Sequence, residues 1–354
     1  MTSYLKASKE VELLPAPGSL AARILEGGVL GVVGGTPLVR LRGVGGDRLR
    51  VFAKLEGHNP GGSSKDRPAL SIMRRAVETG AVVPGTVVVE SSSGNMGIGL
   101  AQVCRYLELR FICVVDARTT SQNIAILRAY GAEVDVVREP DPATGEFLPA
   151  RLARVRDLLQ SFGSTFWPDQ FGNEANCDAH REGTMREIVA ELDGDVDYVF
   201  CATSTCGTLR GCAEHARALG LPAEVVAVDA LGSVIFGGPS AERIIPGLGS
   251  GLPPSLLLPG LASRHVHVTN LDCVVGCRRI ALREALLVGG SAGGVYTAFE
   301  RIQDDLPDGG TCVLVFSDRG ERYLDTIFSD DWVRHRFGDV AHLWTEAERT
   351  VSWT

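Results

Sequence analysis

The chain has 354 residues, of which 45% are hydrophobic and 22% charged, a composition typical of a globular protein with a sizeable core. Its formal net charge is −8 and it contains no run of Lys and Arg, which argues against nucleic acid or an anionic membrane as partners. The longest apolar runs have the length of a strand and are too short to span a membrane.

The N-terminus and the cysteines allow predictions of where the protein is located and whether it binds a metal. Residues 1–11 contain no apolar stretch of the kind found in secretory signals. Nine cysteines are present, none in a C-x-x-C pair, and most lie in apolar segments. Buried thiols in a reducing compartment explain this pattern better than zinc ligands or a disulfide framework. We therefore expect a cytoplasmic protein without a metal site.

Short β-branched runs alternate along the chain with longer helical patterns. Strands are predicted at Arg50–Glu56, Gly85–Ser91, Arg110–Asp116, Ala132–Val137, Val196–Thr203, Ala223–Ala230, His265–Asn270 and Thr311–Asp318. Apolar residues that recur every three or four positions predict helices at 65–80, 95–109 and 121–131. Nearly continuous apolar strands separated by helices predict an α/β fold with parallel sheets covered on both faces.

The first loop with chemical potential is "NPGGSSKDRP", Asn59 to Pro68. Its glycines and serines free the backbone before a helix that opens at Lys65, with Pro68 tolerated in the first turn. A lysine at such a strand-to-helix junction points into the cleft where α/β sheets bind ligands. If desolvated there, its amine can act as the nucleophile that a Schiff base requires.

The second loop is "ESSSGNMG", Glu90 to Gly97, which also leads from a strand into a helix. The hydroxyls of Ser92 and Ser93, together with the first N–H groups of the helix, suit a carboxylate. The amide of Asn95 suits a phenolic oxygen. Taken alone, the same residues fit an ordinary helix cap better than a ligand site.

The third loop is "ATSTCGTLRG", Ala202 to Gly211, which follows a predicted strand. Hydroxyl groups at Ser204, Thr205 and Thr208, next to Gly207 and a helix start, suit a phosphate monoester. No G-K-[ST] follows, so the loop is not a Walker motif.

In order and spacing the three loops resemble the cysteine synthase/tryptophan synthase β family of pyridoxal-phosphate enzymes, known as fold type II. The resemblance runs from "GGTPLVRL" (Gly34–Leu41) through "DQFGNEAN" and "VGGSAGG" to "RGERYLDT" (Arg319–Thr326), nearly the whole chain. It implies pyridoxal 5'-phosphate as cofactor and two lobes, each with a mainly parallel twisted sheet covered by helices. Residues 1–56 and 166–354 would form a large cofactor-anchoring domain, and residues 57–165 a smaller mobile domain for the substrate carboxylate.

The resemblance also implies roles for single residues. Lys65 would form the Schiff base with the cofactor, and Asn95 would contact its ring oxygen. Ser291 would face the pyridine nitrogen, with Asp318 as the fallback partner; a serine there moderates the electron sink, which suits β-elimination and replacement. The phosphate would be held by Ser204, Thr205, Cys206, Gly207 and Thr208. The substrate carboxylate would be held by Ser92, Ser93 and Gln170.

Two features resemble a narrower branch of the family. Ser204 and Cys206 stand where sulfide-using relatives typically carry glycines, and the segment Asp229–Gly251 is most similar to the N-(2-amino-2-carboxyethyl)-L-glutamate synthases. These enzymes of 2,3-diaminopropionate biosynthesis, which serves siderophores and peptide antibiotics, join O-phospho-L-serine to the amine of L-glutamate. The resemblance thus predicts a transferase that performs β-replacement through an enzyme-bound aminoacrylate.

Such substrates bring several negative charges, which require arginine or several N–H donors. Arg151 is the preferred substrate contact, and Phe171 beside Gln170 would line the pocket. Arg243 is a second candidate. Arg154 and Arg156 fit a solvated helix face at least as well.

Other functions remain open at this point. A cysteine synthase or O-phosphoserine sulfhydrylase would share every catalytic residue and differ in the nucleophile, and a serine/threonine dehydratase would use water. A protein of a different class would use this fold only for binding, with Lys65 structural. The resemblance suggests a homodimer acting on small amino-acid substrates, to which Met1–Leu30 and Trp332–Thr354 would contribute surface.

Overall fold

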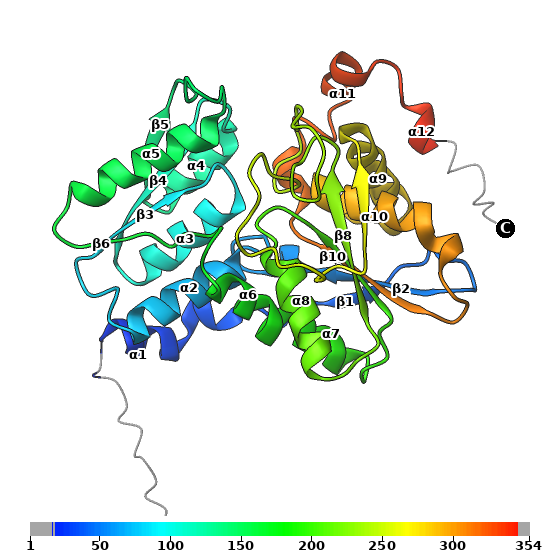
Figure 1. Cartoon of the computed structure of the whole chain (residues 1–354), viewed down its shortest axis with the longest axis horizontal. Coiled ribbons are helices and arrows are strands. Elements are labelled where there is room, and N and C mark those ends of the chain that lie inside the picture. The colour runs from blue at the N-terminus through cyan, green and yellow to red at the C-terminus, as the bar shows by residue number, and fades with distance from the viewer. Residues whose placement is uncertain (1–15, 17, 346–354) are drawn as a thin grey trace, which may run out of the picture.

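The computed structural model describes residues 16 and 18–345, which contain two β-sheets flanked by helices (Figure 1). The six-stranded sheet has the order β1 (Leu38–Arg40), β2 (Arg50–Leu55), β10 (Thr311–Phe316), β7 (Tyr198–Ala202), β8 (Glu224–Ala230), β9 (Arg264–Val268). The four-stranded sheet has the order β5 (Glu133–Val137), β4 (Arg110–Asp116), β3 (Val87–Ser91), β6 (Thr165–Phe166).

Every strand pair is parallel except the β1–β2 pair, which is antiparallel. All eight predicted strands are present, with ends that shift by at most two residues. The strands β1 and β6 were not predicted, because three and two residues are too short to produce an alternating pattern.

The helices surround the sheets on both faces. They are α1 (Leu20–Glu26), α2 (Asp66–Glu78), α3 (Asn95–Tyr106), α4 (Ser121–Ala129), α5 (Phe147–Gln160), α6 (Ala175–Ala179), α7 (Arg186–Glu191), α8 (Gly207–Ala218), α9 (Asn270–Glu284), α10 (Gly290–Ile302), α11 (Asp330–Phe337) and α12 (His342–Thr345). The short helices are η1 (Gly28–Val32), η2 (Glu56–His58), η4 (Gln303–Asp305), η5 (Gly320–Tyr323) and the π-helix η3 (His180–Met185).

Alternate residues of each strand point to opposite faces of the sheet, and both faces are covered by helices. In the small sheet, Val88 packs on the side of α3, whereas Val89 packs against Val155 of α5 on the other side. In the large sheet, Phe200 meets Phe299 of α10 edge to face, and its neighbour Val199 faces α8. These observations confirm the predicted α/β fold with helices on both faces.

The two sheets draw on different parts of the chain. The small sheet uses only residues 87–166, while the large sheet combines residues 38–55 with residues 198–316. The domain boundaries expected at residues 57 and 166 remain a prediction.

A buried ionic cluster connects α2 to the large sheet. Arg67 of α2 donates from Nε to Glu56 Oε2 at 2.6 Å, and its Nη1 lies 2.7 Å from Glu187 Oε1. The ammonium of Lys54 on β2 lies 3.0 Å from Glu187 Oε2 and donates to Thr36 O at 2.5 Å. The side chains of Glu56 and Lys54 are fully buried, so each charge depends on its partners.

Replacing Arg67 by Ala should lower the free energy of unfolding by about 3 to 5 kcal/mol, because Glu56 would keep a buried charge without its partner. The matched control is Arg75→Ala on the same helix, whose exposed pair with Asp178 at 3.3 Å should matter by at most about 1 kcal/mol. Urea denaturation of both variants measures the difference, and equal losses would contradict the assignment.

Candidate active site

Lys65 caps the N-terminus of α2 in a half-buried position. Its backbone N–H donates to Ser63 Oγ at 3.2 Å, and its Nζ lies 3.4 Å from Ser64 Oγ. Burial lowers the pKa of Lys65, while the carboxylates of Asp318 and Glu56 oppose that shift. A larger share of neutral amine follows, which is the form that attacks a carbonyl carbon.

The chain contains only four lysines, and this narrows the choice of nucleophile. Lys6 and Lys9 lie outside the described residues. The ammonium of Lys54 is held between Glu187 and Glu191, at 3.0 and 2.8 Å. Within the described part of the chain, Lys65 is thus the lysine that is not tied up in an ion pair.

The lysine loop is held in place from both sides. Asp66, the first residue of α2, accepts the Gly61 N–H at 2.5 Å, and burial raises the pKa of its carboxyl to about 7. The Ser64 N–H donates to Ser317 O, 2.7 Å away, just after β10. The loop is therefore anchored to the large sheet at the position of Lys65.

Asn95 and Ser291 approach the same place from two other helices. Asn95 opens α3 and donates from Nδ2 to Asp318 Oδ2 at 2.8 Å. Asp318, whose charge acts on Lys65, also accepts the Gly289 N–H at its backbone oxygen, 3.1 Å away. Ser291 lies two residues further on, in the first turn of α10, and is 3% exposed. Asp318 thus lies at the centre of the predicted ring-binding residues.

The loop after β7 has the shape expected of an anion site. Cys206 adopts the left-handed conformation at φ 66° and precedes α8, whose first N–H groups lack intrahelical partners. The Gly207 N–H donates to Thr205 Oγ1 at 3.4 Å, and Thr208 Oγ1 lies 3.2 Å from His180 Nε2. The half-exposed Ser204 completes the loop.

His180 of the π-helix η3 contacts this loop through Thr208. Its imidazole is fully buried, with Nδ1 3.0 Å from Thr184 Oγ1 and Nε2 directed at Thr208. Burial lowers its pKa well below the usual value, and the charges of Lys65 and Arg67 add to that effect. The ring is therefore neutral, and it supports the anion loop through its contact with Thr208.

Of the two serines after β3, Ser92 caps the start of α3 with its side chain. Ser92 Oγ accepts the N–H groups of Gly97 at 3.0 Å and Gly94 at 3.3 Å. Ser93 is half-buried, and its backbone oxygen accepts from Asn123 Nδ2 at 3.0 Å. The Ser92 hydroxyl also donates to Gly94 O, a long contact of 3.5 Å that a ligand could replace.

Gln170 is bound to both neighbouring segments. Its Nε2 donates to Ser91 O at 3.1 Å, and its N–H donates to Glu90 Oε2 at 3.2 Å. Asn176 Nδ2 donates both to Gln170 O at 2.8 Å and to Thr205 Oγ1 at 3.2 Å. This one amide connects the substrate-side residue with the anion loop.

The arginines differ in their surroundings. Arg151 Nε lies 3.4 Å from Asp116 Oδ2, and its buried Nε and Nη1 make no hydrogen bond among the described residues. Arg154 is exposed and pairs with Asp135 at 2.8 Å, as a solvated helix face requires. Arg243 donates to backbone oxygens of its own loop, including Ala241 O at 3.0 Å. Arg151 therefore keeps more unused donors than Arg154.

Phe171 is half-buried beside Gln170. Its backbone oxygen accepts from Ser255 Oγ at 2.8 Å, which ties it to the long segment between β8 and β9.

Sequence analysis missed three residues of this site. Asn176 lies inside the motif "DQFGNEAN", and His180 follows four residues later, but neither has a local pattern that distinguishes it from a helix residue. Glu90 begins the second predicted loop, but the sequence assigns no role to its side chain. Its carboxylate is buried and accepts N–H groups from Ser91, Gln170 and Trp167, and burial raises its pKa to about 7.

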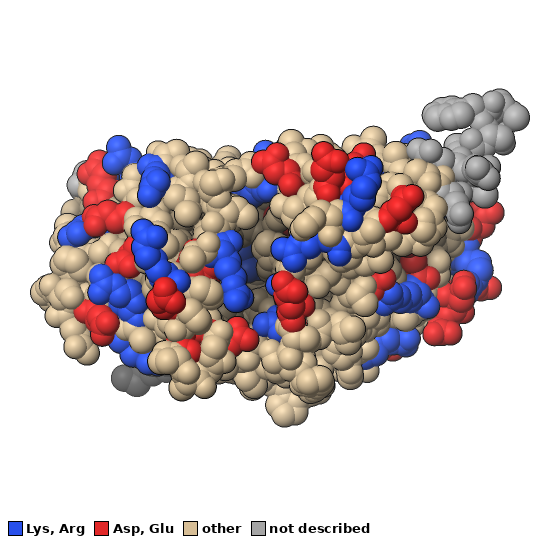
Figure 2. All heavy atoms as spheres, turned by 90° about the horizontal axis from the view of Figure 1, so that it is seen from above, with Lys and Arg blue, Asp and Glu red and all other residues tan. Residues whose placement is uncertain are grey.

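The molecular surface is hollowed between the halves that contain the two sheets. Figure 2 shows this hollow near the middle of the molecule, with Lys and Arg side chains along its border. Basic side chains at the entrance favour the approach of anionic ligands, although the net charge is −8.

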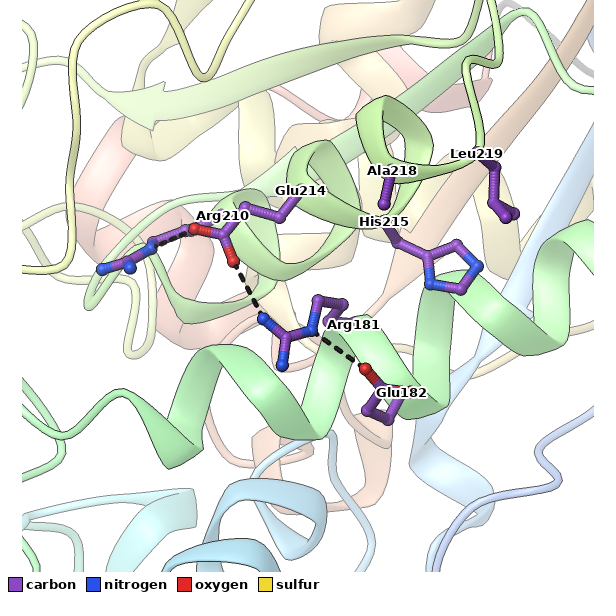
Figure 3. A pocket seen from close by; sticks show the side chains of 7 residues that line it. All are labelled: Arg181, Glu182, Arg210, Glu214, His215, Ala218 and Leu219. Carbon is purple, nitrogen blue, oxygen red and sulfur yellow. Dashed lines mark hydrogen bonds and ion pairs between the residues drawn. The ribbon is translucent and has the colours of Figure 1, made fainter. Parts of the chain in front are cut away.

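A second depression lies elsewhere, between α8 and the π-helix (Figure 3). Its volume is about 600 Å³, and its charged side chains are paired with one another, as in Arg210–Glu214 at 2.6 Å and Arg181–Glu182 at 2.9 Å. None of the predicted cofactor-binding or substrate-binding residues lines it, so this depression is not the candidate site.

Taken together, the groups fit a phosphorylated aldehyde cofactor. A desolvated lysine would suit the carbonyl carbon of such a cofactor, and a helix start with hydroxyl groups would suit its phosphate. Asn95 supplies an amide donor for a ring oxygen, and Asp318 Oδ1 is a buried acceptor without a hydrogen-bond partner among the described residues.

The shape of the anion loop can be tested without a ligand. A Cβ on Gly207 would lie 2.1 Å from Asn176 Oδ1, so Gly207→Ala should lower the free energy of unfolding by about 1 to 3 kcal/mol. The control is Gly163→Ala, where no atom lies within 4 Å of the added Cβ. Thermal denaturation of both variants measures the difference, and an unchanged Gly207→Ala protein would contradict this packing.

Known proteins share these features. A family model described as "Pyridoxal-phosphate dependent enzyme" matches residues 29–318. An N-(2-amino-2-carboxyethyl)-L-glutamate synthase of Ralstonia nicotianae is 42% identical over 306 residues, which cover 86% of this chain and 90% of that protein.

Solved structures agree with that match. An O-ureido-L-serine synthase superposes with a TM-score of 0.79 at 32% identity, covering 86% of this chain and 97% of the other. A hydrogen sulfide-producing enzyme of Fusobacterium nucleatum gives 0.78 at 30% identity, covering 84% and 97%. The predicted family and cofactor are thereby confirmed, and the chain belongs to the pyridoxal-phosphate dependent enzymes of fold type II.

Proposed function

We propose that this enzyme replaces the phosphate of O-phospho-L-serine by the amine of L-glutamate, which yields N-(2-amino-2-carboxyethyl)-L-glutamate and phosphate. The observation that carries the proposal is the 42% identity, over most of both chains, to the synthase of that name. The predicted place of this product is 2,3-diaminopropionate biosynthesis.

The cofactor-binding residues are assigned by their chemistry. Bound pyridoxal phosphate supplies an electron sink for the bond at the substrate Cα. Lys65 holds the cofactor aldehyde and, once released, removes the Cα proton and later returns it. Asn95 donates to the ring oxygen and Ser291 faces the ring nitrogen. The phosphate is bound by Ser204, Thr205, Cys206, Gly207 and Thr208.

The substrate-binding residues form a second group. The hydroxyls of Ser92 and Ser93 and the amide of Gln170 bind the amino-acid carboxylate. Arg151 contacts the anionic part of a substrate, and Phe171 lines the pocket beside Gln170. The hydroxyl of Ser204 adds a donor close to the cofactor phosphate or the incoming substrate. The unused buried N–H groups of Arg151 support this choice.

Exclusion of water is assigned to a movement of the smaller domain, residues 57–165. The serines that follow β3 lie in this segment, so binding of the carboxylate would draw the small sheet toward the large one. Closure would protect the reactive product of elimination from hydrolysis.

The proposal is tested by incubating the holoenzyme with O-phospho-L-serine and L-glutamate. Phosphate and an adduct with the mass of N-(2-amino-2-carboxyethyl)-L-glutamate are expected. Lys65→Ala should lower the rate by about a hundredfold or more and abolish the visible absorption of the bound cofactor. Borohydride reduction of the wild-type holoenzyme, followed by peptide mass analysis, should place the cofactor on Lys65 rather than on the other three lysines.

A sulfide-using enzyme is the second candidate, because one structural neighbour at 30% identity is a hydrogen sulfide-producing enzyme. The same assay with sulfide in place of glutamate distinguishes the two. Cysteine formed faster than the glutamate adduct would overturn the choice of nucleophile while leaving Lys65 in place. Keto acid from serine alone would instead indicate a dehydratase.

We also propose a homodimer in the cytoplasm. The free state of all nine cysteines supports a reducing compartment, and no helix in residues 18–345 is long and apolar enough to cross a membrane. Leu25 and Val32, near the N-terminus, are 69% and 62% exposed, and a second copy of the chain would bury them.

Light scattering should give twice the mass of 37.7 kDa for the wild-type protein. The double variant Leu25→Asp/Val32→Asp should have a measured mass closer to that of the monomer, because two charges would be buried at the interface. The control is Leu324→Asp. Leu324 directly follows η5 and its side chain is 51% exposed, so this variant should keep the mass of the wild type. A monomeric wild type contradicts this surface assignment.

A further inference from the structure

The amide of Asn95 is held at both ends by the segment that follows β10. Its Nδ2 donates to Asp318 Oδ2 at 2.8 Å, and its Oδ1 accepts from the Arg322 guanidinium. A guanidinium has no acceptor and an ionised carboxylate has no donor, so the amide cannot be rotated by half a turn without losing both bonds. The second N–H of Nδ2 therefore has a fixed direction.

Asp318 is itself rigidly held. Its Oδ2 accepts from Tyr323 Oη at 2.5 Å in addition to Asn95, and the residue is 4% exposed. A Cβ on Gly289 would lie within 1.9 Å of Asp318 Oδ1, so the start of α10 packs directly on the carboxylate. Burial raises the pKa of Asp318, while Tyr323, Asn95 and the charges of Arg322 and Lys65 lower it. The carboxylate thus has both donors and positive charges that favour its ionised form.

The same segment holds the lysine loop. Besides its contact with Asn95, Arg322 donates to Gly61 O, and Ser317 O accepts the Ser64 N–H at 2.7 Å. One short stretch of chain after β10 therefore sets the position of Lys65 and of Asn95 relative to each other.

We propose that Asp318 and Arg322 are positioning residues that orient Asn95, so that its remaining N–H donates to the ring oxygen of the cofactor. The inference rests on the proposed contact of Asn95 with that oxygen. Neither residue touches the reacting atoms: Asp318 removes one amide proton from competition, and Arg322 fixes which end of the amide carries the donor.

The test is a double-mutant cycle on binding of pyridoxal phosphate to enzyme from which the cofactor has been resolved. Asp318→Asn should weaken binding by about tenfold or more when Asn95 is present, since a hydrogen bond to a charged group is lost. In the Asn95→Ala background the same change should alter binding by no more than about twofold, because the group through which it acts is gone. Asp325→Asn, an exposed residue of the same segment, is the matched control and should leave binding unchanged.

A spectroscopic readout separates orientation from general damage. The visible absorption maximum of the holoenzyme should shift in the same direction in Asp318→Asn and Asn95→Ala, with no further shift in the double variant. Equal losses of affinity in both backgrounds, or no loss when Asn95 is present, would overturn the inference. If Asp318→Asn does not fold, Arg322→Met against Asn95→Ala is the second cycle, with the same expectation.

The two proposals fail in different ways. A wild-type holoenzyme without visible absorption, or a Lys65→Ala variant that retains it, would overturn both the proposed function and this inference. Normal absorption that depends on Lys65, combined with an uncoupled cycle, would overturn the positioning role alone.

Discussion

The positive charge of Lys65 has to be accommodated in a place largely withdrawn from water, and most of the site is organised around this constraint. Desolvation alone would favour the neutral amine, and the carboxylates of Asp318 and Glu56 work against it. The two carboxylates therefore limit how far burial lowers the pKa of Lys65. Glu56 is in turn held by Arg67, so the buried cluster beneath α2 and the chemistry at its N-terminus are parts of one electrostatic arrangement.

The loops show how far a sequence can be read. Lys65, Asn95 and Thr208 each lie where a glycine- and hydroxyl-rich loop leads into a helix, and it is the order and spacing of the three loops that identified them as ligand loops. The parallel sheets bring such loops together at the carboxyl ends of strands. Strands with long apolar runs were equally accessible, because their burial leaves a continuous signal.

The contacts between segments far apart in the chain could not be predicted from the sequence. His180 meets Thr208 across 28 positions, and Asn95 meets Asp318 across 223. Neither contact can be recognised from the residues around it in the sequence. A buried imidazole or carboxylate differs from an exposed one only through tertiary packing. Asp318 could be noticed from its place after β10, but its Oδ2 contacts with Asn95 and Tyr323 could not.

The strand order of the large sheet has a consequence for the growing chain. β10 lies between β2 and β7, although it is the last strand to be synthesised. The small sheet has all its strands once residue 166 has emerged, whereas the edges of β2 and β7 stay unpaired on one side until residue 316 follows. During synthesis the protein therefore carries two open strand edges for much of its length, a state in which assistance by a chaperone protects against mispairing.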